Sequence, residues 1–82
     1  MKVILLTNNV VLLAKIEEVG AEIGEPDCRL INPYRLNISD STLSPWMVGV
    51  SEQSIYMISS DKILTIADPT EELSEKYNSL VK

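Results

Sequence analysis

The sequence predicts a small all-β domain, a strongly bent five-stranded antiparallel sheet or barrel, followed by one C-terminal helix. Short β-branched and apolar runs alternate with turn residues over about residues 2–67. The apolar period then changes to that of a helix over about residues 69–81. The chain has 82 residues and no internal repeat or linker, so we expect a single domain spanning residues 1–82.

Two apolar runs near the N-terminus predict a β-hairpin. They cover residues 3–6 and 10–16 and are separated by Thr7, Asn8 and Asn9. Because asparagine tolerates a positive φ, the pair Asn8-Asn9 predicts a tight hairpin turn.

A loop and a third strand follow this hairpin. Residues 20–27 contain two glycines and a proline, which predicts a loop, and a strand is expected over residues 28–36. Cys28 is the single cysteine, and we interpret it as a small apolar residue at the start of that strand. Pro33 has no amide hydrogen, so the strand should lie at a sheet edge or carry a bulge at that residue.

The second half of the sheet is less clearly defined by its pattern. Residues 37–45 are rich in Ser, Thr and Asn and predict a second loop. Apolar runs at 46–50 and 55–58 flank a polar stretch and form either one long bent strand or a hairpin. A short turn at Ser59-Ser60-Asp61 and a last strand over residues 63–67 complete the predicted sheet.

The C-terminal segment carries the signals of a helix start. Asp68 is predicted as the N-cap, Pro69 as the first helical residue and Glu71 as the third, in a capping-box arrangement. The helix should carry one apolar stripe, made of Leu73, Tyr77, Leu80 and Val81. We expect this stripe to cover one end of the barrel.

The charge and residue types argue against most enzymes. Seven basic and twelve acidic residues give a net charge of −5, which weakens generic binding to phosphate. The absence of histidine removes the commonest general base and metal ligand. Ser59 and Ser60 have no neighbouring base, and the acidic residues of the 18–27 loop do not have EF-hand spacing. We therefore expect no catalytic residue, no metal and no cofactor.

The N-terminal apolar run has four residues before Thr7, which is too short for a signal peptide core. No later run approaches the roughly 20 residues needed to span a bilayer. One free thiol fits a reducing compartment. We expect a cytoplasmic protein without a membrane segment.

The two strand pairs resemble the Sm-like family of small bent barrels that assemble into rings. Residues 3–16, with the Asn8-Asn9 turn and the small Ala14, are similar to the first two Sm strands. Residues 55–66 look like the second Sm motif, two apolar strands around a short turn. The short acidic form with its C-terminal helix is similar to Sm-like proteins of cyanophage-type viruses, which would place the protein in a host cytoplasm.

The resemblance implies a homo-oligomeric ring and an RNA site at the loops. The implied site comprises the turns and one strand segment: Asn8, Asn9, Tyr34, Arg35, Ser59, Ser60, Asp61 and Lys62. The sequence departs from the family because the Ser59-Ser60 turn has no arginine and the helix follows the last strand. For Tyr34, packing competes with base stacking, and Lys62 serves equally well as a strand residue that discourages edge aggregation.

Two functional hypotheses remain open. The first is a non-enzymatic Sm-like ring that binds single-stranded RNA weakly or selectively. The alternative is a protein-interaction scaffold whose acidic surface binds a basic partner rather than RNA, because charge of one sign accumulates with each subunit.

Overall fold

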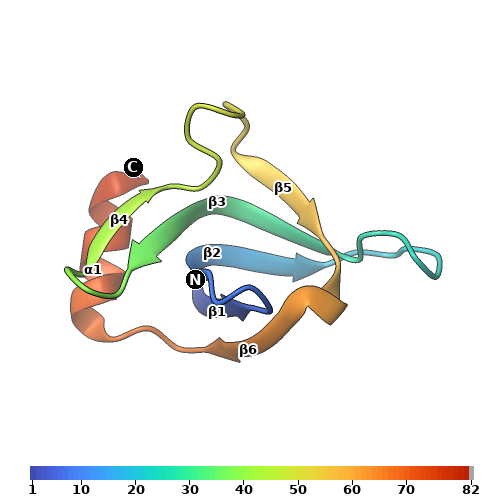
Figure 1. The fold of residues 1–82 in the computed structure, drawn as a ribbon, viewed down its shortest axis with the longest axis horizontal. Helices are drawn as coiled ribbons and strands as arrows, with labels where there is room; N and C mark the ends of the chain where they lie inside the picture. The colour runs from blue at the N-terminus through green and yellow to red at the C-terminus, as the bar shows by residue number, and fades with distance from the viewer. Residues whose placement is uncertain (82) are drawn as a thin grey trace.

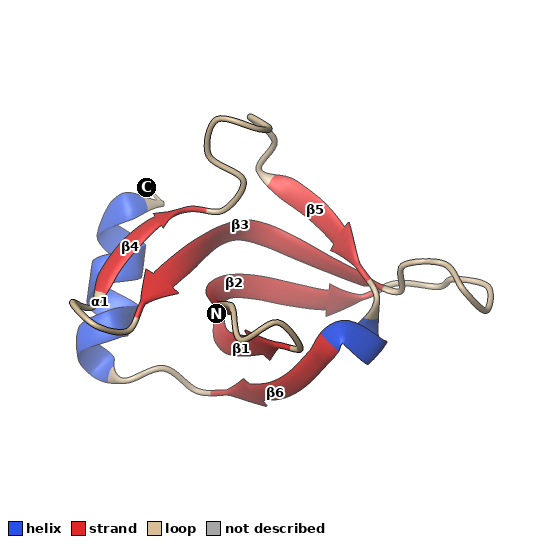
Figure 2. Cartoon of the chain, viewed as in Figure 1, coloured by secondary structure: helices blue, strands red, loops and turns tan. Residues whose placement is uncertain are grey.

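The computed structural model describes residues 1–81, which form an antiparallel β-sheet and a C-terminal helix (Figures 1 and 2). The elements in chain order are β1 (Lys2–Leu6), β2 (Val11–Glu18), β3 (Cys28–Asn37), β4 (Thr42–Pro45), β5 (Ile55–Ile58), the one-turn 3₁₀ helix η1 (Ser60–Lys62), β6 (Ile63–Ala67) and α1 (Glu71–Leu80). The predicted combination of an all-β sheet with a C-terminal helix is confirmed. No helix within residues 1–81 is long and apolar enough to cross a membrane.

The sheet has six strands and is not closed into a barrel. Its order is β4-β3-β2-β1-β6, and β5 pairs with the first half of β3. The predicted antiparallel sheet is confirmed, whereas the barrel and the count of five strands are wrong. A sixth strand, β4, pairs with the second half of β3, whereas β5 and β6 make no strand pair with each other in residues 1–81.

The first hairpin forms as predicted. β1 and β2 pair antiparallel, with Leu5 opposite Val11, and Asn9 has a φ of 65° in the turn. The amide of Asn9 donates to the carbonyl oxygen of Leu6 at 3.0 Å, which closes the turn. Asparagine at this point accepts the left-handed backbone that the turn requires.

Pro33 lies at a bulge in a central strand. The register between β2 and β3 shifts between Leu13 and Lys15, opposite Asn32 and Pro33. Asn32 has a φ of 51°, so the chain bends at this place. The edge alternative is wrong, because β3 has partners on both sides, and the predicted bulge is confirmed.

The region between β3 and β5 differs from the prediction. The predicted loop 37–45 contains the strand β4, whose residues pair with Tyr34 to Asn37. The predicted strand 46–50 is a turn in which the amides of Val50 and Ser51 donate to the carbonyl oxygen of Met47. Met47 and Gly49 have φ values of 64° and 76°, and such left-handed residues interrupt an extended chain.

The N-cap of the helix is Thr70, not Asp68. The Thr70 hydroxyl oxygen accepts from the amide of Leu73 at 3.3 Å, and Thr70 has extended backbone angles. Asp68 instead pairs with the ammonium group of Lys2. This ion pair forms because β1 and β6 are antiparallel neighbours, with Val3 opposite Ala67.

The core lies on the inner side of the curved sheet. Its buried residues come from the first three strands: Ile4, Leu6, Leu12, Ala14 and Leu30. Trp46 packs partly buried against this cluster and its ring contacts that of Tyr56, with centroids 5.6 Å apart. On the other side, Tyr34 contacts Tyr77 of α1 with ring centroids 5.9 Å apart.

Candidate functional site

A polar cavity of about 510 Å³ lies between the β1–β2 turn and the β3–β4 hairpin. Six polar side chains line it: Asn9, Arg35, Asn37, Ser39, Thr42 and Ser44. We call this space the polar cavity. It brings together Asn9 and Arg35, two of the residues that the sequence placed in a binding site.

The sheet register positions Arg35 in this cavity. Arg35 lies opposite Leu12 of β2 and opposite Ser44 of β4, so it is held between two strands. Asn9 reaches the same place from the neighbouring hairpin turn. The cavity is therefore built by residues that are distant in the sequence but meet at one end of the sheet.

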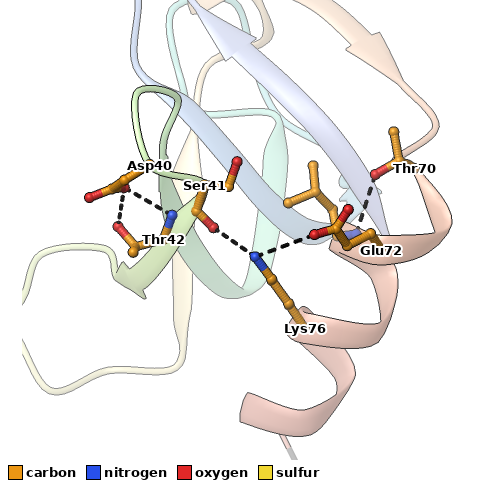
Figure 3. A network of polar contacts seen from close by, with 7 residues as sticks. Asp40, Ser41, Thr42, Thr70, Glu72 and Lys76 are labelled. Carbon is orange, nitrogen blue, oxygen red and sulfur yellow. Dashed lines mark hydrogen bonds and ion pairs between the residues drawn. The ribbon is translucent and has the colours of Figure 1, made fainter.

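Short hydrogen bonds fix the β3–β4 turn. The carboxylate of Asp40 accepts from the hydroxyl of Thr42 at 2.7 Å and from its amide at 3.1 Å (Figure 3). Both bonds lower the pKa of Asp40 below its usual value, and the bond from the Thr42 hydroxyl is the largest cause. The side-chain oxygen of Asn37 accepts from the hydroxyl and the amide of Ser39 at 2.8 and 3.1 Å. The cavity wall made by this turn is thus ordered by its own side chains.

The helix α1 is attached to the same turn. The ammonium group of Lys76 donates to the carbonyl oxygen of Ser41 at 3.4 Å and lies 3.8 Å from the carboxylate of Glu72 (Figure 3). Figure 3 shows Lys76 reaching from the helix between these two oxygens. The helix therefore supports the turn that carries Thr42.

Three side chains of the polar cavity have no partner within residues 1–81. Asn9, Arg35 and Ser44 make no side-chain hydrogen bond or ion pair there, whereas Arg29 pairs with Glu17 at 3.1 Å. The donors of the Arg35 guanidinium group are thus not used by another side chain within residues 1–81.

The predicted site at residues 59–62 has a different environment. Ser60 donates to the carboxylate of Asp27 from both its amide and its hydroxyl, each at 2.7 Å. These bonds lower the pKa of Asp27, with the hydroxyl bond as the largest cause. The Asp27–Ser60 contact joins the β2–β3 loop to η1, and it places a carboxylate directly beside the predicted site.

Lys62 and the first hairpin turn lie side by side. The amide of Thr7 donates to the carbonyl oxygen of Lys62 at 2.9 Å. The side-chain oxygen of Asn8 is used inside the turn, where it accepts from the amide of Val10 at 3.2 Å. Asp61 follows Ser60 in η1 and is exposed.

The predicted site residues therefore fall into three places. Asn9 and Arg35 line the polar cavity, residues 59–62 form or precede η1, and Tyr34 packs against the helix. The pattern of the sequence did not predict the four other polar residues of the cavity, Asn37, Ser39, Thr42 and Ser44. Their only signal was the Ser/Thr/Asn-rich composition of residues 37–45, which predicted a loop.

A second feature is an apolar groove of about 540 Å³ beside β6. Its apolar lining comprises Ile16, Cys28, Ile63, Leu64 and Ile66. Leu64 and Ile66 are 58% and 49% exposed, although Ile66 lies opposite the fully buried Ile4. This pairing places Ile66 on the core side of the sheet, so an apolar surface is left uncovered there.

Cys28 lines this groove at the beginning of β3 and is 5% exposed. Burial raises the pKa of its thiol, and the nearby carboxylates of Asp27 and Glu18 raise it further. The thiol therefore stays protonated and is a poor nucleophile. Among residues 1–81, no three His, Cys, Asp or Glu side chains are grouped to hold a metal ion.

The fold and these two surfaces define a small mostly-β domain with a C-terminal helix and an open sheet. The chain belongs to DUF6561, a family of unknown function, whose family model matches residues 1–82. No curated protein matches the sequence.

Proposed function

We propose that this chain is a non-enzymatic assembly protein that joins copies of itself into a closed ring. The edge of β5 in one subunit would pair with the edge of β6 in the next. The observation that carries the proposal is the exposure of two large apolar side chains, Leu64 and Ile66, on the edge strand β6, with Ile66 on the core side of the sheet.

An unpaired edge exposes a row of amide and carbonyl groups that another strand can satisfy. β6 has β1 as its only strand partner in residues 1–81, so its other edge is open. A strand added at this edge would also cover the apolar surface of Leu64 and Ile66. Burying apolar surface contributes about 25 cal/mol per Å², so such a contact is favourable for association.

β5 offers a matching strand. Tyr56 and Ile58 lie opposite Leu30 and Cys28, both of which are buried, so they share the core side of the sheet. Pairing β5 of one subunit with β6 of the next would continue the core across the contact. Because β5 and β6 are different surfaces, the contact is heterologous, and it forms a closed ring when the rotation between neighbouring subunits divides a full turn. The resemblance to Sm-like rings supports the same arrangement.

The mass of the protein in solution tests this proposal. We expect light scattering to give a multiple of the 9.1 kDa subunit mass at micromolar concentration. Leu64→Lys should reduce the mass to that of one subunit, since a buried unpaired charge opposes the contact. Ile23→Lys is the matched control, because Ile23 is fully exposed in the β2–β3 loop. A parent protein that stays at 9.1 kDa would contradict the proposal.

Weak binding of single-stranded RNA is a second candidate function. The observation that favours it is the position of Lys62 beside the Asn8-Asn9 turn. This position brings together two segments of the predicted RNA site, the Asn8-Asn9 turn and residues 59–62. A ring would repeat this lysine once in each subunit. The net charge of −5 and the Asp27 carboxylate beside Ser60 work against tight binding.

Titration with oligo(U) at two salt concentrations tests the RNA candidate, because phosphate-driven binding weakens steeply with salt. Lys62→Ala should weaken binding, and Ser59→Arg should strengthen it. If neither substitution changes binding and a basic protein binds the ring instead, the acidic scaffold is the better description. The net charge of −5 per subunit favours that alternative.

A further inference from the structure

We propose that the polar cavity binds a small phosphate monoester of nucleotide size through Arg35. This inference goes beyond self-assembly and does not depend on it, because the cavity lies between the β1–β2 turn and the β3–β4 hairpin rather than at the β5 and β6 edges. The cavity volume of about 510 Å³ falls within the range of roughly 300–1,000 Å³ that is typical of small-molecule sites.

Arg35 determines the charge of the ligand. A guanidinium group presents a planar set of donors that matches two oxygens of a phosphate or carboxylate. Arg35 has no ion pair with another residue in the range 1–81, whereas Arg29 forms an ion pair with Glu17. The hydroxyl of Ser44, directly opposite Arg35 in the register, can donate to the same anionic group.

The remaining lining determines the rest of the ligand. Asn9 and Asn37 each carry amide donors, and the Asn9 side chain has no hydrogen bond within residues 1–81. Side-chain amides can pair with the polar edge of a base or with sugar hydroxyls. Val11, Leu36 and Ile38 add apolar lining that suits the faces of a ring. A phosphate joined to a sugar or a nucleoside combines these properties.

The negative net charge of the protein disfavours the binding of a nucleic-acid strand at this site. One guanidinium group can pair with one phosphate group, whereas a net charge of −5 repels the many phosphates of a long strand. The ligand expected here is therefore a single monoester, either a nucleoside monophosphate or a sugar phosphate.

Titration of the ¹⁵N-labelled full chain, followed by NMR, tests the proposal. The ligands are UMP, AMP, ribose 5-phosphate, inorganic phosphate and uridine. We expect at least one of the three monoesters to shift the amide signals of Asn9, Arg35 and Ser44, and uridine to leave them unchanged. Comparing UMP and AMP with ribose 5-phosphate distinguishes a nucleotide from a sugar phosphate as the source of the monoester.

Arg35→Gln should weaken the affinity for the monoester by about tenfold or more, as expected for loss of a charge-assisted hydrogen-bonded pair. Ser44→Ala should weaken it less. Arg29→Gln is the matched control, since it makes the same change of charge on the same strand but at an ion pair with Glu17, and it should leave binding unchanged. Equal binding by Arg35→Gln and the parent overturns the proposal, as does the absence of shifts with every monoester. A uridine decamer that binds these residues more tightly than UMP also overturns it and favours the RNA candidate.

Discussion

The hydroxyl of Tyr77 donates a hydrogen bond of 2.9 Å to the carbonyl oxygen of Asn32. Asn32 lies in the β3 bulge, where the register with β2 shifts and the ladder is interrupted. The helix therefore supplies a partner to a carbonyl group that lies within the bulge. Burial raises the pKa of Tyr77, with a further contribution from Tyr34, so its hydroxyl keeps its proton as a donor.

Tyr77→Phe should lower the free energy of unfolding by about 1–3 kcal/mol, because it leaves the Asn32 carbonyl without this donor. Urea denaturation measures the change. Tyr34→Phe is the matched control, since the Tyr34 hydroxyl makes no hydrogen bond within residues 1–81 and the ring contact with Tyr77 is kept. Equal losses in the two variants would show that the hydrogen bond from the Tyr77 hydroxyl contributes nothing specific to stability.

Thr70→Ala should lower the free energy of unfolding by about 0.5–2 kcal/mol through loss of the N-cap acceptor. Asp68→Ala should have a smaller effect, because Asp68 contributes only an exposed ion pair with Lys2. Thermal unfolding of the two variants at one pH compares them. A larger loss of stability for Asp68→Ala than for Thr70→Ala would contradict the assignment of Thr70 as the N-cap.

The Asp27–Ser60 contact should be lost in acid. Hydrogen bonds from Ser60 lower the pKa of Asp27 from its ordinary value of 3.8, so the ionised carboxylate is favoured in the folded state. The stabilisation is present above pH 3.8 and disappears as the pH falls through the lowered pKa. The amide shift of Ser60, followed by NMR, should therefore titrate with a midpoint below 3.8. Asp27→Asn should remove this titration, and a midpoint at or above the ordinary value would disprove the contact.

Asn9→Ala should lower the free energy of unfolding by about 1–2 kcal/mol, because Asn9 has a φ of 65° and alanine is strained in left-handed backbone. Asn9→Gly should cost less, since glycine adopts this conformation without strain. Urea denaturation again gives the comparison. If the alanine and glycine variants are equally stable, the turn has another backbone conformation in solution.

Several features of the fold could be predicted from the sequence because their causes are local. The Asn8-Asn9 turn follows from the tolerance of asparagine for positive φ. The missing amide hydrogen of Pro33 limited its strand to an edge position or a bulge, and the structure has the bulge. The change of apolar period likewise located the C-terminal helix within one or two residues at each end. Each of these signals lies in a few consecutive residues.

The candidate site was predicted only in part, because Asn9 and Arg35 meet through strand pairing rather than through sequence spacing. β4 was missed for the same reason: its residues are mostly exposed, so they lack the apolar alternation of a half-buried strand, and their pairing with β3 makes them a strand. The N-cap was likewise decided by a distant contact, since Lys2 on the neighbouring strand pairs with Asp68 and leaves the cap to Thr70. The sequence alone therefore determined the first hairpin turn, the restriction at Pro33 and most strand positions. The tertiary structure decided the open edges, the cap and the polar cavity, because these depend on which distant backbone segments share hydrogen bonds.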